Sequence, residues 1–313
     1  MIYDLIIIGA GPAGITASVY AARLGLKFLV ITKDIGGQAA ASGDVENYTG
    51  YQFITGPELA AKFEEHLRKF SIELRENEAV IDIKKDDGGI ISVKSEKNNY
   101  FARAAIVASG KRSRMLNVPG EIEFKNRGLT YCAICDGPLF KGKDVAVIGG
   151  GNSALDAVLQ LIRIAKRIYI VNIASDFTAD KTMLEEVKIA KNVTALHNAK
   201  VSAIIGDKFV KAIKLDIQGI DKEISVEGVF VEIGLIPNSE FAPIVARNKH
   251  NEIKIDSYNR SDAAGIFAAG DVTDVAEKQI IIAAGEGAKA ALSVFKYLAQ
   301  PGKLTNSGAV RYS

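Results

Sequence analysis

The residues most capable of chemistry in this 313-residue chain are its two cysteines, which lie in the segment YCAICDG from Tyr131 to Gly137. Cys132 and Cys135 have the spacing of a dithiol on one helical turn, where two sulfurs can close a small disulfide ring. Such a pair is easily reduced and re-oxidised, because a low thiol pKa favours both thiolate attack and thiolate departure. The carboxylate of Asp136 follows directly. We interpret the pair as an electron relay.

A zinc site and a structural disulfide are the two alternatives for these cysteines. A structural zinc ion needs four Cys or His ligands, and the chain offers only His66, His197 and His250 besides the pair, scattered singly. A disulfide that closes so short a loop removes little entropy from the unfolded chain. The sequence therefore favours a redox role, and we expect no metal site.

Composition is that of a soluble globular protein, with 48% hydrophobic and 24% charged residues. The 39 Lys and Arg against 37 Asp and Glu leave a net charge of +2, so no basic excess points to nucleic acid. We find no signal peptide and no apolar run of membrane-spanning length. We therefore expect a cytoplasmic protein, in which the pair serves as catalytic thiols.

The elements that must position this chemistry begin with a glycine-rich motif near the N-terminus. Leu5–Ile8 has the composition of a buried parallel strand, and a helical pattern runs from Ile15 to Leu24. Between them the sequence GAGPAG, from Gly9 to Gly14, is a GxGxxG motif. Its glycines permit a tight turn and close approach of a pyrophosphate to the helix N-terminus. The motif predicts a dinucleotide site, with a plain glycine-rich turn as the alternative.

The segments that follow predict the rest of a first domain. Phe28–Thr32 is the next strand, and a long loop containing Gly36-Gly37-Gln38 and Glu46-Asn47-Tyr48 could enclose a cofactor. An amphipathic helix is expected over 57–70. From Ile72 to Val107 short alternating strands predict a small antiparallel layer. The charged run from Lys111 to Arg114 interrupts the pattern, and we place a domain boundary there.

A second glycine-rich motif follows the dithiol. The strand Val145–Ile148 leads into GGGNSA, a GxGxxA from Gly149 to Ala154, and a helix to about Ala165. The next strand, Arg167–Val171, ends at Asn172. In this fold that position usually carries an acid for an NAD ribose, or basic residues nearby for a 2′-phosphate. Asn172 can hydrogen-bond a ribose hydroxyl without a carboxylate's charge, and no arginine pair follows it.

The last third of the chain returns to strand patterns. Strand-like pieces run through Gly228–Gly234, and an apolar strand from Gly265 ends in Gly270-Asp271. An aspartate there can bind ribitol hydroxyls of a flavin, or it can simply cap a helix. A helix is expected from Gln279 to Leu298, and the tail from Pro301 to Ser313 is polar.

Taken together, these motifs resemble the low-molecular-weight thioredoxin reductase family along essentially the whole chain. The resemblance rests on the order of five motifs: GxGPAG at Gly9–Gly14, GGQ at Gly36–Gln38, CxxCDG at Cys132–Gly137, GGGNSA at Gly149–Ala154 and AGD at Ala269–Asp271. The segment from Lys278 to Ala288 is also similar to the flavoprotein part of alkyl hydroperoxide reductase.

The resemblance implies an α/β protein with two Rossmann-like, three-layer domains, the second inserted in the first. Residues 1–113 and 244–313 would form an FAD-binding domain, and residues 114–243 a pyridine-nucleotide-binding-like domain with the dithiol. The implied FAD-binding residues are Gly9, Gly11, Pro12, Ala13, Gly14, Thr32, Gly37, Gln38, Asn47, Gly110, Gly270, Asp271, Lys278, Gln279 and Ile280. Those implied for NAD(P)H are Gly149, Gly151, Asn152, Ser153 and Asn172.

The resemblance also implies a role for each residue of the dithiol. Cys135 would exchange electrons with the flavin, Cys132 would attack the disulfide of a thioredoxin-like protein, and Asp136 would move the proton. The expected enzyme is an FAD-dependent thioredoxin-disulfide reductase that acts as a homodimer.

The chain departs from this family at the electron donor. Members that use NADPH carry an HRRxxxR-like motif where this chain has Asn172–Thr178, and the NADH-using peroxide-reductase relative carries a glutamate at Asn172. We therefore expect NADH rather than NADPH as donor. One alternative takes electrons from reduced ferredoxin, and another is a flavin-bearing redox sensor without turnover. A flavin oxidoreductase of the ferredoxin–NADP reductase type should lack the CxxC pair.

Overall fold

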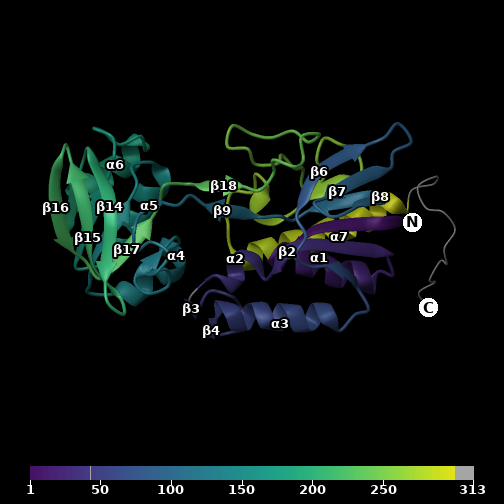
Figure 1. Cartoon of the computed structure of the whole chain (residues 1–313), viewed down its shortest axis with the longest axis horizontal. Coiled ribbons are helices and arrows are strands. Elements are labelled where there is room, and N and C mark those ends of the chain that lie inside the picture. Colours follow the sequence, from purple (N-terminus) through teal and green to yellow (C-terminus); the bar gives the residue numbers. More distant parts are fainter. Residues whose placement is uncertain (43, 300–313) are drawn as a thin grey trace. The chain divides into compact units, whose positions relative to one another are not determined.

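A computed structural model of the chain describes residues 1–42 and 44–299, so the predicted polar tail from Pro301 lies outside the described residues (Figure 1). The chain forms two compact units. The outer unit comprises residues 1–112 and the chain from Ile236 onward, and the inserted unit comprises Ser113–Leu235. The chain passes from one unit to the other through two short strands, β9 (Lys111–Ser113) and β18 (Leu235–Pro237), which pair with each other.

The segment 236–243 packs within the outer unit, whereas the domain bounds implied by the resemblance included it in the inserted domain. Ala242 is fully buried in the same apolar cluster as Ile6 and Ile8, and the carbonyl of Phe241 accepts a hydrogen bond from Ile83 N at 3.0 Å. The apolar pattern of the preceding strands continues through Ile236, so the sequence does not mark the boundary between the two units there.

A seven-stranded sheet forms the centre of the outer unit, in the order β5-β2-β1-β8-β7-β6 with β19 also paired to β8. The strands β1, β2, β5, β8 and β19 run parallel, whereas β6, β7 and β8 pair antiparallel. The expected antiparallel layer over 72–107 is thus part of the main sheet, because β5 and β8 pair with its parallel strands. The strands are β1 Ile2–Ala10, β2 Phe28–Ile35, β5 Glu73–Arg75, β6 Val80–Lys85, β7 Ile91–Ser95, β8 Asn99–Val107 and β19 Ile266–Ala268.

Helices cover one face of this sheet, and α1 and α7 lie side by side on it (Figure 1). Glycine at 287 permits this contact, because a Cβ there would lie 2.8 Å from the carbonyl carbon of Ala13. The helix α3 starts at a capping box in which Thr55 and Glu58 exchange hydrogen bonds. The remaining elements of the unit are α1 Pro12–Arg23, α2 Gly37–Ala40, β3 Asp44–Val45, β4 Ile54–Thr55, α3 Gly56–Arg68, the 3-10 helix η2 Gly270–Val272 and α7 Ile280–Leu298.

The inserted unit is built on a five-stranded parallel sheet in the order β10-β17-β11-β12-β13. From β11 the chain winds to β12 and β13 on one side, whereas β17 lies on the other side of β11. The direction of winding therefore reverses between β11 and β17, which is where open α/β sheets bind ligands. Its parallel-sheet elements are β10 Leu129–Thr130, α4 Ala133–Asp136, the 3-10 helix η1 Gly137–Phe140, β11 Asp144–Ile148, α5 Asn152–Leu161, β12 Arg167–Val171, α6 Lys181–Ile189, β13 Val193–Leu196 and β17 Gly228–Val231.

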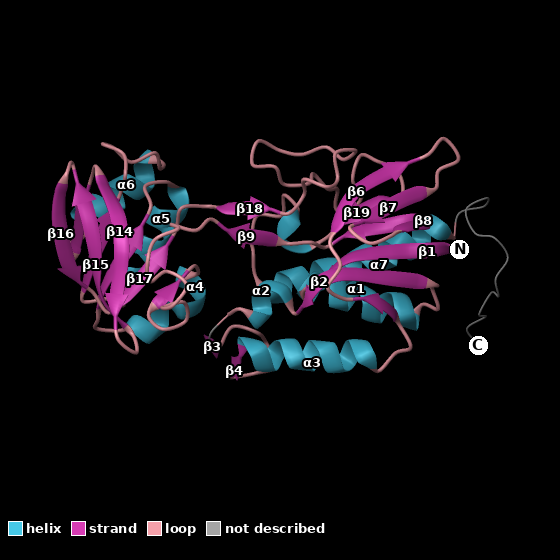
Figure 2. Cartoon of the chain, viewed as in Figure 1, coloured by secondary structure: helices cyan, strands magenta, loops and turns pink. Residues whose placement is uncertain are grey.

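A three-stranded antiparallel sheet packs on one face of this parallel sheet (Figure 2). Its strands are β14 Ala199–Gly206, β15 Val210–Ile217 and β16 Ile220–Ser225. Leu215 and Ile213 from this sheet share one buried cluster with Ala146 and Ile148 of β11. The expected α/β class with two Rossmann-like sheets is confirmed. Along residues 1–42 and 44–299, no helix is both long and apolar enough to cross a membrane.

Candidate active site

The first glycine-rich turn connects β1 to α1, and its backbone lies so close to neighbouring backbone that side chains at its glycines would clash. Gly9 has φ +101°, and a Cβ there would lie 2.9 Å from the carbonyl carbon of Ala108. A Cβ on Gly14 would lie 2.8 Å from the carbonyl carbon of Gly9. The N-cap Gly11 has no side chain and therefore gives the first amides of α1 no capping hydrogen bond. Uncapped amides at a helix N-terminus are suited to an anionic group.

Residues from distant parts of the sequence meet at this turn. A Cβ on Gly37 would lie 3.3 Å from the Cα of Gly11, and one on Gly270 would lie 2.9 Å from the Cβ of Ala13. The buried Thr32, in β2, accepts a hydrogen bond from Ala10 N at 3.1 Å through its hydroxyl. The fold thus brings GGQ, AGD and GxGxxG together, as a dinucleotide cradle requires.

Asp271 lies beside a cluster of charged residues that we call the Lys111–Glu252–Lys278 cluster. Lys111 Nζ lies 2.5 Å from Glu252 Oε1, and Lys278 Nζ lies 3.5 Å from the same oxygen. Burial raises the pKa of the Asp271 carboxyl, and the charges of Lys278 and Lys111 oppose this shift. Burial, together with the charge of Lys111, lowers the pKa of Lys278. Desolvation therefore favours the neutral form of the Asp271 carboxyl, whereas the charges of the two lysines favour its ionised form.

Lys111 and Glu252 were not among the residues predicted for the site. The sequence pattern treated Lys111 as part of a charged boundary, whereas its side chain is only 9% exposed. Its partner is 141 residues away in sequence, so local pattern gave no indication of the pair.

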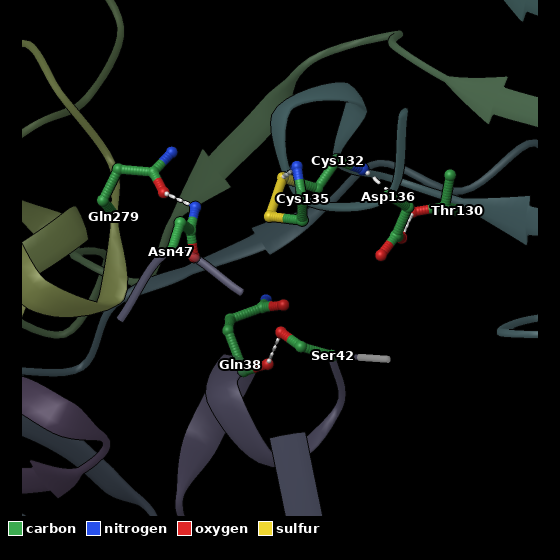
Figure 3. Close-up of a disulfide and its surroundings, with 8 residues drawn as sticks. All are labelled: Gln38, Ser42, Asn47, Thr130, Cys132, Cys135, Asp136 and Gln279. Carbon is green, nitrogen blue, oxygen red and sulfur yellow. Dashed lines mark hydrogen bonds between the residues drawn. A yellow bond between two sulfur atoms is a disulfide. The ribbon is translucent and has the colours of Figure 1, made fainter. Parts of the chain in front are cut away.

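Five more predicted residues of the outer unit lie in its loops and at the start of α7. Gln38 donates from its side-chain amide to the carbonyl of Lys111 at 2.6 Å. Asn47 donates to Gln279 at 3.1 Å, which ties the loop before β4 to the start of α7, where Ile280 is the first helical residue (Figure 3). Gly110 has φ +66° and open space at its Cβ position, a backbone conformation that favours glycine.

The two cysteines form a disulfide at the start of α4, with their Cα atoms 5.4 Å apart (Figure 3). Cys132 is the N-cap residue, and its sulfur accepts a hydrogen bond from the backbone N–H of Cys135 at 3.2 Å. Both residues are partly exposed. The dithiol predicted from the spacing is confirmed as a disulfide on a helical turn.

Asp136 is buried, with 8% of its surface exposed, and Thr130 orients it (Figure 3). The Thr130 hydroxyl donates to Asp136 Oδ2 and accepts from the backbone N–H of Cys132 at 3.2 Å. One hydroxyl thus joins the acid to the first cysteine. Thr130 was not predicted, although its place two residues before Cys132 could have suggested it.

The second glycine-rich turn has the same backbone plan as the first. Gly149 has φ +144°, and a Cβ there would lie 2.9 Å from the Cβ of Ala154. The helix α5 begins after the N-cap Gly151, which again has no side-chain cap. The predicted residues Asn152 and Ser153 form its exposed first turn.

Asn172 lies against this turn, and its own chain already occupies its amide. The side chain is 3% exposed, donates to the carbonyl of Asp176 at 2.8 Å and accepts from Ala174 N at 3.1 Å. A Cβ at Gly150 would lie 2.8 Å from Asn172 Nδ2. Asn172 therefore organises the loop after β12.

The same loop folds back onto α5 and carries acids instead of bases. Asn152 and Asp180 exchange two hydrogen bonds, of 3.0 and 2.9 Å. Between Asn172 and Asp180 the charged residues are Asp176 and Asp180, with no lysine or arginine. Within the described residues, no group of three or more His, Cys, Asp or Glu side chains could hold a metal ion.

Comparison with known proteins identifies the family. The Pyridine nucleotide-disulphide oxidoreductase family matches residues 3–287. The chain belongs to this family. It is 40% identical over 300 residues to NADH dehydrogenase from Bacillus subtilis strain 168, covering 95% of this chain and 58% of that protein. It is 38% identical over 304 residues to a subunit of alkyl hydroperoxide reductase, that of Escherichia coli K12, with shares of 95% and 58%. The chain thus spans less than two thirds of these two relatives.

Among solved structures, thioredoxin reductase from Streptococcus pyogenes MGAS5005 superposes with a TM-score of 0.90 at 35% identity. The match covers 95% of this chain and 98% of that one. This pyridine nucleotide-disulphide oxidoreductase therefore has the thioredoxin reductase fold and a disulfide redox centre.

FAD is typical of this family, and the outer unit fits it. The glycine cradle and the uncapped start of α1 suit a pyrophosphate, and Asp271 suits ribitol hydroxyls. When bound, FAD would supply an electron pair to a disulfide.

Proposed function

We propose that this protein is an FAD-dependent thioredoxin-disulfide reductase. The observation that carries the proposal is the Cys132–Cys135 disulfide with a buried acid, Asp136, tied through Thr130 to the backbone of Cys132. A sensor that only changes its binding state has no need of a positioned proton carrier. The likeness to thioredoxin reductases supports a thioredoxin-like acceptor and a homodimer.

The proposed turnover gives each residue of the dithiol one task. Two electrons break the Cys132–Cys135 bond and leave a thiolate and a thiol, with one proton taken up. The Cys132 thiolate attacks the disulfide of the acceptor and forms a mixed disulfide. Cys135 then attacks the Cys132 sulfur, which releases the reduced acceptor and restores the internal disulfide. Asp136 holds and returns the proton during these exchanges.

We propose NADH rather than NADPH as the electron donor. The loop from Asn172 to Asp180 offers no cation to pair a 2′-phosphate, and its acids would repel one. Charge-assisted contacts to phosphate contribute about 1.5–3 kcal/mol, so their absence costs NADPH roughly ten- to a hundredfold in affinity. The name of the Bacillus subtilis relative supports this preference.

Reduced ferredoxin is the second candidate donor. The occupied amide of Asn172 favours it, because that side chain must leave Asp176 and Ala174 before it can bind a ribose hydroxyl. A protein donor would not need a nucleotide site at this turn.

Anaerobic stopped-flow reduction of the flavin by NADH, NADPH and reduced ferredoxin, in parallel, tests the donor. We expect NADH to reduce the flavin faster than NADPH at equal concentration. Rapid reduction by tightly bound NADPH would refute the assignment of NADH as donor. Reduction by ferredoxin alone would establish the second candidate. A preparation without flavin that FAD cannot reconstitute would refute the function itself.

A further inference from the structure

The hydroxyl of Thr130 joins two groups of the redox centre, and chemistry fixes the direction of both of its hydrogen bonds (Figure 3). A backbone N–H can only donate, so the hydroxyl oxygen accepts from the N–H of Cys132, at 3.2 Å. The single hydrogen of the hydroxyl is then donated to Asp136 Oδ2. This arrangement favours an unprotonated Oδ2 and directs a proton on Asp136 to Oδ1.

The inserted unit holds Thr130 and its two partners in place. Thr130 is the last residue of β10, where it pairs with Phe230 of β17. The side chains of Thr130 and Asp136 are both buried. The carbonyl of Cys132 accepts a hydrogen bond from the Asp136 N–H at 3.2 Å, so the backbone of Cys132 is bound on both sides. None of these hydrogen bonds involves a sulfur atom, and opening the disulfide therefore breaks none of them.

The elements around Asp136 supply no positive charge to its carboxylate. A buried carboxylate is costly unless cations or hydrogen-bond donors stabilise it. The helix α4 and the elements η1 and α5, which pack against it, contain no lysine or arginine. Hydrogen-bond donors such as the Thr130 hydroxyl must therefore stabilise the ionised form. The titratable groups of the surrounding segments are Asp156 on α5, Glu232 directly after β17, and Tyr131, which donates to Glu121 at 2.9 Å.

We propose that Thr130 is a positioning residue for proton transfer at the dithiol, whose hydroxyl holds Asp136 as a carboxylate that takes the exchanged proton on Oδ1. The proposal rests on the proposed role of Asp136 as the proton carrier. A donor to the ionised form of a carboxyl lowers its pKa relative to the same site without the donor. If Thr130 only filled space, an apolar side chain of similar shape would serve equally well.

The test measures the protonation of Asp136 directly, by infrared titration of the oxidised holoprotein. The disulfide form is used because its cysteines do not titrate. The carboxyl band of Asp136 is isolated by subtracting the spectrum of the same protein with Asp136→Asn. The parent is compared with Thr130→Val, which keeps the β-branched shape and removes the hydroxyl, and with Thr130→Ser, which keeps the hydroxyl.

We expect the titration midpoint of Asp136 in Thr130→Val to lie about one to two pH units above that of the parent, the shift that corresponds to a lost hydrogen bond to a charged group. Thr130→Ser should titrate with the parent. One midpoint for all three proteins would overturn the proposal. An equal rise in both variants would also overturn it, because packing rather than the hydroxyl would then be responsible.

A further variant keeps the test decisive if Thr130→Val does not fold. Thr130→Ala also removes the hydroxyl, so its midpoint should rise as well, and an unchanged midpoint would contradict the proposal.

A second measurement connects this protonation with turnover. Each protein is reduced anaerobically with dithionite, and its re-oxidation by oxidised thioredoxin is followed by stopped flow as a function of pH. The pH profile of Thr130→Val should move to higher pH by the same amount as its spectroscopic midpoint, and Thr130→Ser should follow the parent. An unmoved profile with a raised midpoint would refute the role of Thr130 in turnover. Failure of every protein, the parent included, to reduce thioredoxin, with the midpoints shifted as expected, would refute the proposed function alone.

Discussion

The two glycine-rich turns share one backbone plan and differ in the residue that faces them. At the first turn a Cβ on Gly9 would meet the Ala108 carbonyl, and at the second a Cβ on Gly149 would meet the Glu232 carbonyl. Ala108 and Glu232 each donate a backbone hydrogen bond of 2.8 Å to the neighbouring strand, Ala108 to Ile8 in β1 and Glu232 to Ile148 at the end of β11. The second turn thus carries an acid in the place where the first carries a methyl group.

The two turns also differ in the charged groups that surround them. The first has the Lys111–Glu252–Lys278 cluster beside Asp271, whereas the second is bordered by Asp180 and by the amide of Asn172. A glycine motif fixes the turn and the helix start, but neighbours from other strands decide which ligand the turn accepts. The comparison predicts a well-held cofactor at the first turn and a weak nucleotide at the second.

The largest expected effect comes from filling each turn with a methyl group. Gly9→Ala should abolish FAD retention, because the Cβ overlaps the Ala108 carbonyl and φ is +101°. Gly149→Ala is the matched change at the second turn and should leave the flavin bound. The ratio of flavin to protein absorbance after gel filtration distinguishes them. Loss of flavin from Gly149→Ala with retention in Gly9→Ala would reverse our assignment of the two turns.

The acid at the second turn should make stability depend on pH. The pKa of Glu232 is raised from 4.5 to about 8, so the folded state favours the neutral form. Stability from this group is full below pH 4.5 and is lost as pH rises through about 8. Glu232→Gln should therefore gain on the order of a few kcal/mol relative to the parent at pH 9, with little difference at pH 5.

Denaturant unfolding of parent and Glu232→Gln at pH 5, 7 and 9 checks this dependence. The difference between their midpoints should widen with pH. A difference that is constant with pH, or that narrows, would show that Glu232 is ionised in the folded protein at neutral pH.

Adding cations to the loop after β12 should make the second turn more like a 2′-phosphate site. Ile173 and Ala174 are exposed, so the double variant Ile173→Arg/Ala174→Arg should fold normally. We expect NADPH to bind roughly ten- to a hundredfold more tightly than to the parent, with NADH little changed. Nucleotide titrations of the oxidised protein measure both affinities. An equal lack of effect on both nucleotides would favour ferredoxin as donor.

Removing one cation from the first turn should have the smallest effect. Lys278→Met deletes a charge that stabilises ionised Asp271 and a hydrogen bond of 2.6 Å to the Thr273 carbonyl. FAD should dissociate roughly three- to tenfold faster, since the glycine cradle remains. The rate of flavin loss to an apoprotein acceptor measures this, and an unchanged rate would show that the cluster does not contribute to cofactor binding.

Local patterns predicted the elements on which both turns depend. The strand Arg167–Val171 has the predicted bounds, and the helix expected from Gln279 begins at Ile280 with Gln279 as its N-cap. These predictions are correct because buried parallel strands and amphipathic helices have characteristic patterns in runs of neighbouring residues. The dithiol was predicted equally well, because its chemistry lies within four residues.

Features that depend on distant partners could not be predicted. The pattern over Ile72–Val107 predicted a small antiparallel layer, but the pairing of β8 with β1, which joins it to the main sheet, is non-local. Lys111 pairs with Glu252, which lies 141 residues later in the sequence, after the whole inserted unit. The sequence neighbours of these two charged residues give no reason to expect their burial.

The most direct test of the account delivers a counted electron pair without any natural donor. The parent and Cys135→Ser are reduced anaerobically with measured dithionite, mixed with oxidised thioredoxin, and followed by flavin absorbance and by the thiols produced. We predict that the parent re-oxidises its flavin and yields two thioredoxin thiols per flavin, whereas Cys135→Ser keeps its flavin reduced. Transfer at the parent rate by Cys135→Ser, or no transfer by the parent, would contradict the flavin–dithiol relay.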